Sequence, residues 1–219
     1  MLQIFSKNRI LFAGYFLILI FCILLLLFMG KKDTHLFLTG IHSVFFDGFM
    51  KLLTWLGDGI FMIITGVMLL FKRIRYGLII LCSYLASGLL VQLLKRLVFP
   101  GYKRPVIWFH DLGIEIYRIG GVEYHSAFSF PSGHTTTAFT LFFLLAFFVK
   151  SNLLKALFLL MAVITGFSRI YLSQHFLGDT VAGSVLGIFI AVMVYSLFQN
   201  CKTVWLDNNI ISLIWKKNA

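Results

Sequence analysis

The sequence predicts an all-α membrane protein: a bundle of six transmembrane helices with one amphipathic helix at the membrane interface. Hydrophobic residues make up 60% of the 219 residues and charged residues only 12%, whereas about 25% of a soluble domain is charged. The mean hydropathy is +0.94. The charges are clustered between apolar runs, and several of these runs approach the roughly 20 residues that a spanning helix needs. This pattern excludes an ordinary soluble domain and a disordered chain.

The first elements are predicted from the charges that bound them. Residues 10–30 carry no charge and lie between Arg9 and Lys31. This run is longer than the core of a secretory signal and lacks a small-residue cleavage site, so we expect a first span. Residues 33–51 mix charges and histidines with Leu, Phe and Ile. We expect part of this segment to lie flat in the interface as an amphipathic helix.

Basic residues and helix breakers delimit the remaining spans. The second span is expected at 52–71, with Asp58 near its start, and the third at 76–94, before the helix-breaking Phe99-Pro100-Gly101. We expect the polar stretch from 100 to about 130 to form a periplasmic loop between the third and fourth spans. The last three spans are expected at 131–149, 156–172 and 176–200. No linker or repeat divides the chain, so residues 1–219 are expected to form one domain.

The orientation is predicted from the surroundings of the basic residues, because their number differs little between the two sides, ten against nine. The ten lie in short loops and tails with few acidic residues, as in cytoplasmic segments. They are Lys7, Arg9, Lys72, Arg73, Arg75, Lys150, Lys155, Lys202, Lys216 and Lys217. We therefore expect a multi-pass protein of the cytoplasmic (inner) membrane, with both termini in the cytoplasm.

The net charge of +11 indicates binding to anionic lipid or to an anionic substrate. Nucleic acid is a poorer explanation for this charge on so apolar a chain. The three cysteines show no CxxC spacing, so neither a disulfide framework nor a zinc site is expected.

Three clusters of ionisable residues fall on the opposite, non-cytoplasmic side, where such residues at membrane depth are functional candidates. They are Lys95 with Arg104-Pro105; Ser132-Gly133-His134; and Arg169 with His175 and Asp179. Two arginines can each bind a phosphate through paired donors, and a lysine adds a point charge. Pro131 suits the first position of a helix, and the amides of Ser132 and Gly133 would then point out of its N-terminus, where anions bind. Together these features predict an oxyanion site.

The histidines supply the reactive groups. If the last span begins near His175, Asp179 lies four residues on, on the same helix face. Asp179 can then accept a hydrogen bond from one ring nitrogen and leave the other as a nucleophile. His134 is the candidate general acid for the leaving oxygen.

The same residues match three motifs. They read Arg104-Pro105; Pro131-Ser132-Gly133-His134; and Ser168-Arg169, five residues, His175, three residues, Asp179. In this order they resemble the type 2 phosphatidic acid phosphatase superfamily, which includes bacterial integral-membrane lipid phosphatases and vanadium haloperoxidases. The resemblance covers about residues 50–198. The chain departs from the pattern at the family's first lysine, seven residues before the arginine, where it has Leu97. Lys95 is the first candidate for that role, with Arg96 and Lys103 as alternatives. Lys95 lies nine residues before Arg104, and the Pro100-Gly101 turn can accommodate the two additional residues.

The resemblance implies a mechanism without metal or cofactor. His175 attacks the phosphorus, Asp179 orients it, and His134 protonates the departing lipid oxygen. Lys95, Arg104, Ser132, Gly133 and Arg169 hold the phosphate, and water then hydrolyses the phosphohistidine.

Family membership leaves the lipid open. An isoprenyl diphosphate such as undecaprenyl diphosphate is the first expectation, with phosphatidylglycerophosphate, phosphatidic acid and lipid A phosphate as alternatives. A vanadate-dependent haloperoxidase and a non-enzymatic lipid transporter are the competing classes. No nucleic acid is expected as a partner, and the oligomeric state is not readable from the sequence.

Overall fold

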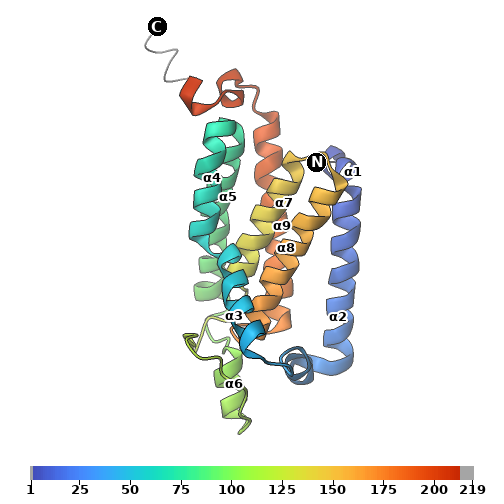
Figure 1. The fold of residues 1–219 in the computed structure, drawn as a ribbon, viewed down its shortest axis with the longest axis vertical. Coiled ribbons are helices and arrows are strands. Elements are labelled where there is room, and N and C mark those ends of the chain that lie inside the picture. The colour runs from blue at the N-terminus through green and yellow to red at the C-terminus, as the bar shows by residue number, and fades with distance from the viewer. Residues whose placement is uncertain (1, 213–219) are drawn as a thin grey trace.

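The computed structural model describes residues 2–212, which form an elongated bundle of helices (Figure 1). No strand occurs in this range. A short helix, α1 (Leu2–Lys7), precedes the long α2 (Arg9–Leu38). The predicted cytoplasmic residues Lys216 and Lys217 lie outside the described residues. The all-α prediction is confirmed.

Four helices are long and apolar enough to cross a membrane. They are α2, α5 (Ile74–Leu93) with its continuation η2 (Leu94–Val98), α8 (Asn152–Tyr171) and α9 (Leu177–Asn200). A fifth candidate is the bent pair of Val44–Gly57 and Gly59–Lys72, whose axes differ by 53°. The fourth predicted span, 131–149, corresponds to α7 (Gly133–Phe148), a shorter apolar helix of 16 residues.

Two predicted elements have different boundaries. The segment 33–51 is divided: its start continues α2 past a kink at Gly30, and its end belongs to α3 (Val44–Leu53). The kink lies at a positive φ of 70°, which glycine adopts without a steric penalty. The predicted span 52–71 is interrupted after the 3₁₀ turn η1 (Thr54–Gly57). Asp58 caps the next helix, α4 (Gly59–Lys72), by accepting a hydrogen bond from the amide of Ile60 at 2.8 Å.

The short helix α7 is the centre of the bundle, packed against α5, α8 and α9. Its Phe139, Leu141 and Phe143 are buried. Glycines on α9 allow the closest approach: a Cβ added at Gly187 would lie 2.5 Å from the carbonyl oxygen of Thr136. Small residues at such a contact are typical of helix pairs in membranes. This packing fixes the first turn of α7 beside the first turn of α9.

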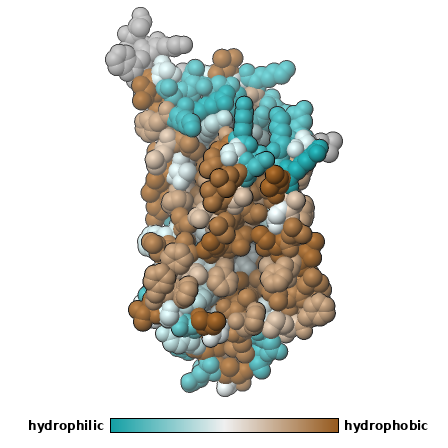
Figure 2. All heavy atoms as spheres, turned by 45° about the vertical axis from the view of Figure 1, so that its right-hand side comes forward, coloured by the Kyte–Doolittle hydropathy of each residue, from teal (hydrophilic) through white to brown (hydrophobic). Residues whose placement is uncertain are grey.

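The outer surface fits a lipid environment. The face in Figure 2 is hydrophobic over most of its height, and hydrophilic residues gather toward its two ends. Leu17, Leu27 and Phe28 of α2 are among the large exposed apolar side chains. At one end of the bundle lie the short α6 (Pro105–Asp111) and the loop 112–132. The other end carries η3 (Val204–Asp207), whose Asp207 forms ion pairs with Arg73 and Arg75.

Candidate active site

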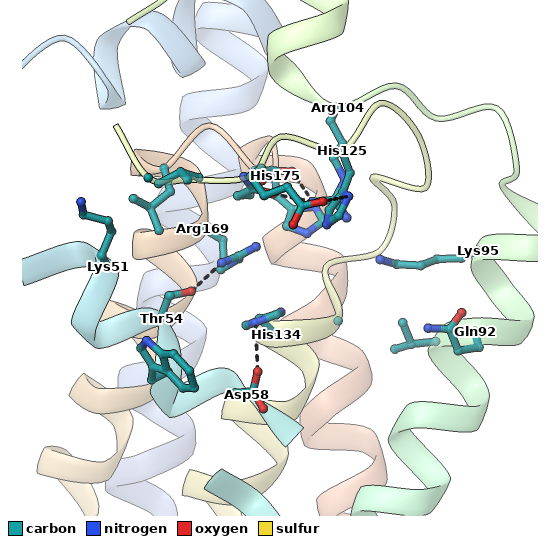
Figure 3. A pocket seen from close by; sticks show the side chains of 18 residues that line it. Lys51, Thr54, Asp58, Gln92, Lys95, Arg104, His125, His134, Arg169 and His175 are labelled. Atoms are coloured by element: carbon teal, nitrogen blue, oxygen red, sulfur yellow. Dashed lines mark hydrogen bonds and ion pairs between the residues drawn. The ribbon is translucent and has the colours of Figure 1, made fainter. Parts of the chain in front are cut away.

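A cavity of about 660 Å³ lies at the end of the bundle where α7 and α9 begin. Its walls come from the η1–α4 break, from α5 and η2, from the loop 121–125, and from the facing ends of α7 and α8. All three predicted clusters reach it (Figure 3). The lining residues among them are Lys95, Arg104, Gly133, His134, Arg169 and His175.

His175 and Asp179 are paired, but not through one helix face as expected. His175 lies in the turn before α9, and Asp179 is the third residue of that helix. The carboxylate accepts hydrogen bonds from the Phe176 amide at 3.0 Å and from the Ser129 hydroxyl at 2.5 Å. Its Oδ2 lies 3.5 Å from Nδ1 of His175. The helix cap therefore orients Asp179, and the ring is left with Nε2 on the side away from the carboxylate.

The burial of His175 determines its protonation. The side chain is 2% exposed, and this burial lowers the pKa of the imidazole to about 3, although Asp179 acts in the opposite direction. The ring is therefore neutral near pH 7, the form in which a ring nitrogen has a free lone pair. Ser129, at 3.5 Å from Nδ1, belongs to this pair. It was missed because nothing in the sequence marks one serine in a polar loop.

Arg104 is held by the turn between α8 and α9 and by the loop 112–132. Its Nη1 donates to Oε1 of Gln174 at 2.8 Å, and its Nε donates to the Ala127 carbonyl at 3.1 Å. Burial lowers the pKa of this guanidinium, and Asp179 opposes the shift. Gln174 also donates to the carbonyl of Glu123 at 2.9 Å and so ties the loop to the cavity. Sequence reasoning missed Gln174, whose neighbour His175 was the residue that the motif identified.

Arg169 approaches from the last turn of α8 and is 8% exposed. Its Nη1 donates to the Thr54 hydroxyl at 2.6 Å. Its Nε has no hydrogen-bond partner among the described residues. A buried donor without a partner is costly, and this one is available to an anion in the cavity.

Of the three candidate cations, Lys95 is the one that lines the cavity. Arg96 bonds Gln92 on the exposed surface, and Lys103 pairs with Asp111 at 2.7 Å. Lys95 sits on η2, a π-helical turn with a hydrogen bond from the Phe99 amide to the Leu94 carbonyl. A π turn holds more residues than an α turn. This turn therefore accommodates part of the longer spacing between Lys95 and Arg104, which the sequence analysis had assigned to the Pro100-Gly101 turn.

The start of α7 differs from the expectation in two respects. Gly133, not Pro131, is its first residue, and Ser132 is the N-cap. The Ser132 amide donates to the carbonyl of Asp179 at 3.0 Å, and its hydroxyl accepts a hydrogen bond from the Thr135 hydroxyl at 2.8 Å. Ser132 is fully buried, so its amide is not free for an oxyanion. The helix begins with Gly133 and His134 at the cavity, and the first amides of a helix have no partner within it.

His134 is the second residue of α7, and its Nε2 lies 3.9 Å from Oδ2 of Asp58 (Figure 3). Asp58 and Thr54 both come from the bend before α4. Sequence reasoning placed Asp58 only near the start of the second span and did not single out Thr54. The signal was present, because an acidic residue inside an apolar run is unusual. Among the described residues, no group of three or more His, Cys, Asp or Glu side chains is placed to hold a metal ion.

Comparison with known proteins decides the family. The sequence-family model of the PAP2 superfamily, the type 2 phosphatidic acid phosphatases, matches residues 76–203 of this chain. The chain belongs to this superfamily. It is 31% identical over 171 residues to a lipid A 1-phosphatase of Rhizobium johnstonii, covering 69% of this chain and 67% of that protein. It is 29% identical over 170 residues to a lipid A 4'-phosphatase of Bacteroides thetaiotaomicron, covering 74% and 75%.

A solved structure shows the same fold. The crystal structure of a PAP2-type phosphatidylglycerolphosphate phosphatase of Bacillus subtilis matches with a TM-score of 0.65 at 22% identity, over 88% of this chain and 98% of that one. The resemblance read from the motifs is thus confirmed. The protein is a multi-pass PAP2 lipid phosphatase, an enzyme that hydrolyses phosphate esters.

Proposed function

We propose that this PAP2 enzyme removes a phosphate monoester from a membrane lipid through a phosphohistidine on His175, with no metal. One observation carries the proposal: a neutral, buried imidazole faces a cavity that Lys95, Arg104 and Arg169 also line. The three cations can neutralise the charge that spreads over the equatorial oxygens in phosphoryl transfer, which is the main catalytic requirement of this reaction.

The proposed reaction has two displacements. Nε2 of His175 forms a bond to phosphorus as the bond from phosphorus to the lipid oxygen breaks, and His134 gives that oxygen its proton. Asp179 holds His175 by Nδ1 throughout. A water molecule then attacks the phosphohistidine and loses a proton to His134, which releases phosphate and restores both histidines.

The relatives support a different lipid from the one first expected from the sequence. The similar proteins include lipid A 1- and 4'-phosphatases and, over 88 residues at 32% identity, a phosphatidylglycerophosphatase B of Bacillus subtilis. We therefore favour a saccharolipid or glycerophospholipid monoester, the alternative reading, over undecaprenyl diphosphate. The partners on this view are the lipid phosphate and the bilayer.

The proposed topology has six spans in one domain of residues 1–219, with the bent α3–α4 pair and α7 each counted as a span. Both termini are placed in the cytoplasm, and the cavity, α6 and the loop 112–132 on the periplasmic face of the inner membrane. The distribution of basic residues supports this orientation.

Phosphate release by the purified protein tests the proposal. The panel holds lipid A, phosphatidylglycerophosphate, phosphatidic acid and undecaprenyl diphosphate, each with a chelator present. We expect release from a monoester, no release by His175→Ala, and normal release by His110→Ala, a histidine of α6 outside this cavity. Turnover that needs an added metal, or that survives in His175→Ala, would contradict the mechanism.

A further inference from the structure

The cavity is also lined by Asp58, a carboxylate that faces His134, and the family match does not include this residue. Asp58 lies outside residues 76–203, in the break between η1 and α4. Building on the proposed phosphatase mechanism, we propose that Asp58 is a positioning residue for His134: it orients the ring and stabilises its protonated form for delivery of the proton to the leaving oxygen.

The geometry of the bend places the carboxylate. Oδ1 of Asp58 accepts the Ile60 amide at 2.8 Å and so caps α4, which leaves Oδ2 to face Nε2 of His134 at 3.9 Å. The bend is pressed against the start of α7, because a Cβ added at Gly57 would lie 2.7 Å from the His134 carbonyl oxygen. Both side chains are about one third exposed, and both line the cavity.

The charges around His134 show why a carboxylate is useful there. Lys95 from η2, Arg104 before α6 and Arg169 from α8 line the same cavity as neutral His175. Lys51 of α3 and the carboxylate of Glu123 line it as well. These cations disfavour a further positive charge on the His134 ring, and the adjacent Asp58 carboxylate offsets this effect. With Nε2 on the side of Asp58, Nδ1 is the nitrogen left for the lipid oxygen. The arrangement parallels that of Asp179 and His175.

The proton that His134 donates in the first half-reaction is replaced in the second. In the first, the His134 imidazolium gives its proton to the lipid oxygen as the phosphorus–oxygen bond breaks, and the ring becomes neutral. In the second, the ring takes a proton from the attacking water. Asp58 remains ionised and touches no reacting atom.

Dependence on the leaving group separates this role from a structural one. An alkoxide needs a proton in order to leave, whereas nitrophenolate does not. We expect Asp58→Asn, which keeps an oxygen to cap α4, to reduce kcat/KM for phosphatidylglycerophosphate by at least about tenfold. For p-nitrophenyl phosphate the reduction should stay below about threefold. His134→Ala should show the same contrast, and Asp111→Asn, an exposed charge that pairs with Lys103, should show neither loss.

A double variant tests whether Asp58 acts through His134. If Asp58 acts through His134, Asp58→Asn in a His134→Ala background causes no further loss. An equal loss on both esters, a full further loss in the double variant, or wild-type values in Asp58→Asn would overturn the inference. Each of these results leaves the phosphatase activity of the wild type intact. Failure of the wild type to hydrolyse either ester would instead overturn the proposed function and this inference together.

Discussion

At the scale of single residues, the site is a set of paired side chains and not a row of separate cations. Asp179 faces His175, Asp58 faces His134, Thr54 holds Arg169, and Gln174 holds Arg104. Groups fixed in this way lose little freedom when the transition state forms, and electrostatic stabilisation depends on that preorganisation.

The protonation of His175 gives the first prediction. Burial lowers the folded-state pKa to about 3, below the ordinary value of about 6.5. The His175 ring should therefore stay neutral as the pH falls through 6.5 and become protonated only near pH 3. NMR titration of histidine-labelled protein between about pH 8 and pH 5 measures this. The signal that His175→Gln removes should not shift, and a midpoint near 6.5 would contradict the account.

A second prediction distinguishes the three candidate cations of the first motif. Lys95→Ala removes the one that lines the cavity, so kcat/KM should fall by about tenfold or more. Arg96→Ala and Lys103→Ala should stay within about threefold of wild type, because these side chains bond Gln92 and Asp111 instead. Equal losses in all three variants would mean that overall charge, not position, determines activity.

At the scale of elements, the packing of α7 on α9 holds the site together. Ser132 links the two helices through its amide bond to the Asp179 carbonyl, and Thr140 donates to the Gly187 carbonyl at 3.1 Å. The positions of His134 and Asp179 therefore depend on one helix contact.

That contact gives a third prediction. Gly187→Ala forces a Cβ to within 2.5 Å of backbone and should destabilise the fold by about 1–3 kcal/mol. The expected observation is a lower melting temperature in detergent. Gly88→Ala is the matched control, since a Cβ there meets nothing within 4 Å. Equal melting temperatures for the two variants would show that the contact is looser than described.

Elements were predictable from the sequence where charges bound an apolar run, as at 10–30 and 176–200. The motif residues were predictable too, because their spacing carries the chemistry. The bend at Asp58 was not, since a single acidic residue in an apolar run does not show which way the chain turns. The engaged amide of Ser132 depends on the carbonyl of Asp179, which is distant in the sequence. Local sequence does not encode that contact.

At the scale of the whole molecule, the apolar middle of the bundle separates two polar ends. The cavity lies at one end, and the pairing of Asp207 with Arg73 and Arg75 lies at the other. A lipid whose tails lie in the bilayer presents its phosphate at the depth of such an end. The active site is proposed to face the periplasm.

Labelling tests this orientation. Single cysteines replace Glu115 in the exposed loop or Lys150 between α7 and α8, in a variant whose Cys22, Cys82 and Cys201 are alanine. In intact spheroplasts, a membrane-impermeant maleimide should label Glu115→Cys, and should label Lys150→Cys only after lysis. The reverse pattern would place the cavity in the cytoplasm.

The stereochemistry at phosphorus shows whether the phosphoryl group is transferred to His175 before it reaches water. A lipid thiophosphate made chiral with oxygen isotopes is hydrolysed in isotopically labelled water, and the configuration of the product is determined. Two in-line displacements, first by His175 and then by water, predict net retention. Net inversion would mean that water attacks the lipid phosphate directly, and would contradict the account.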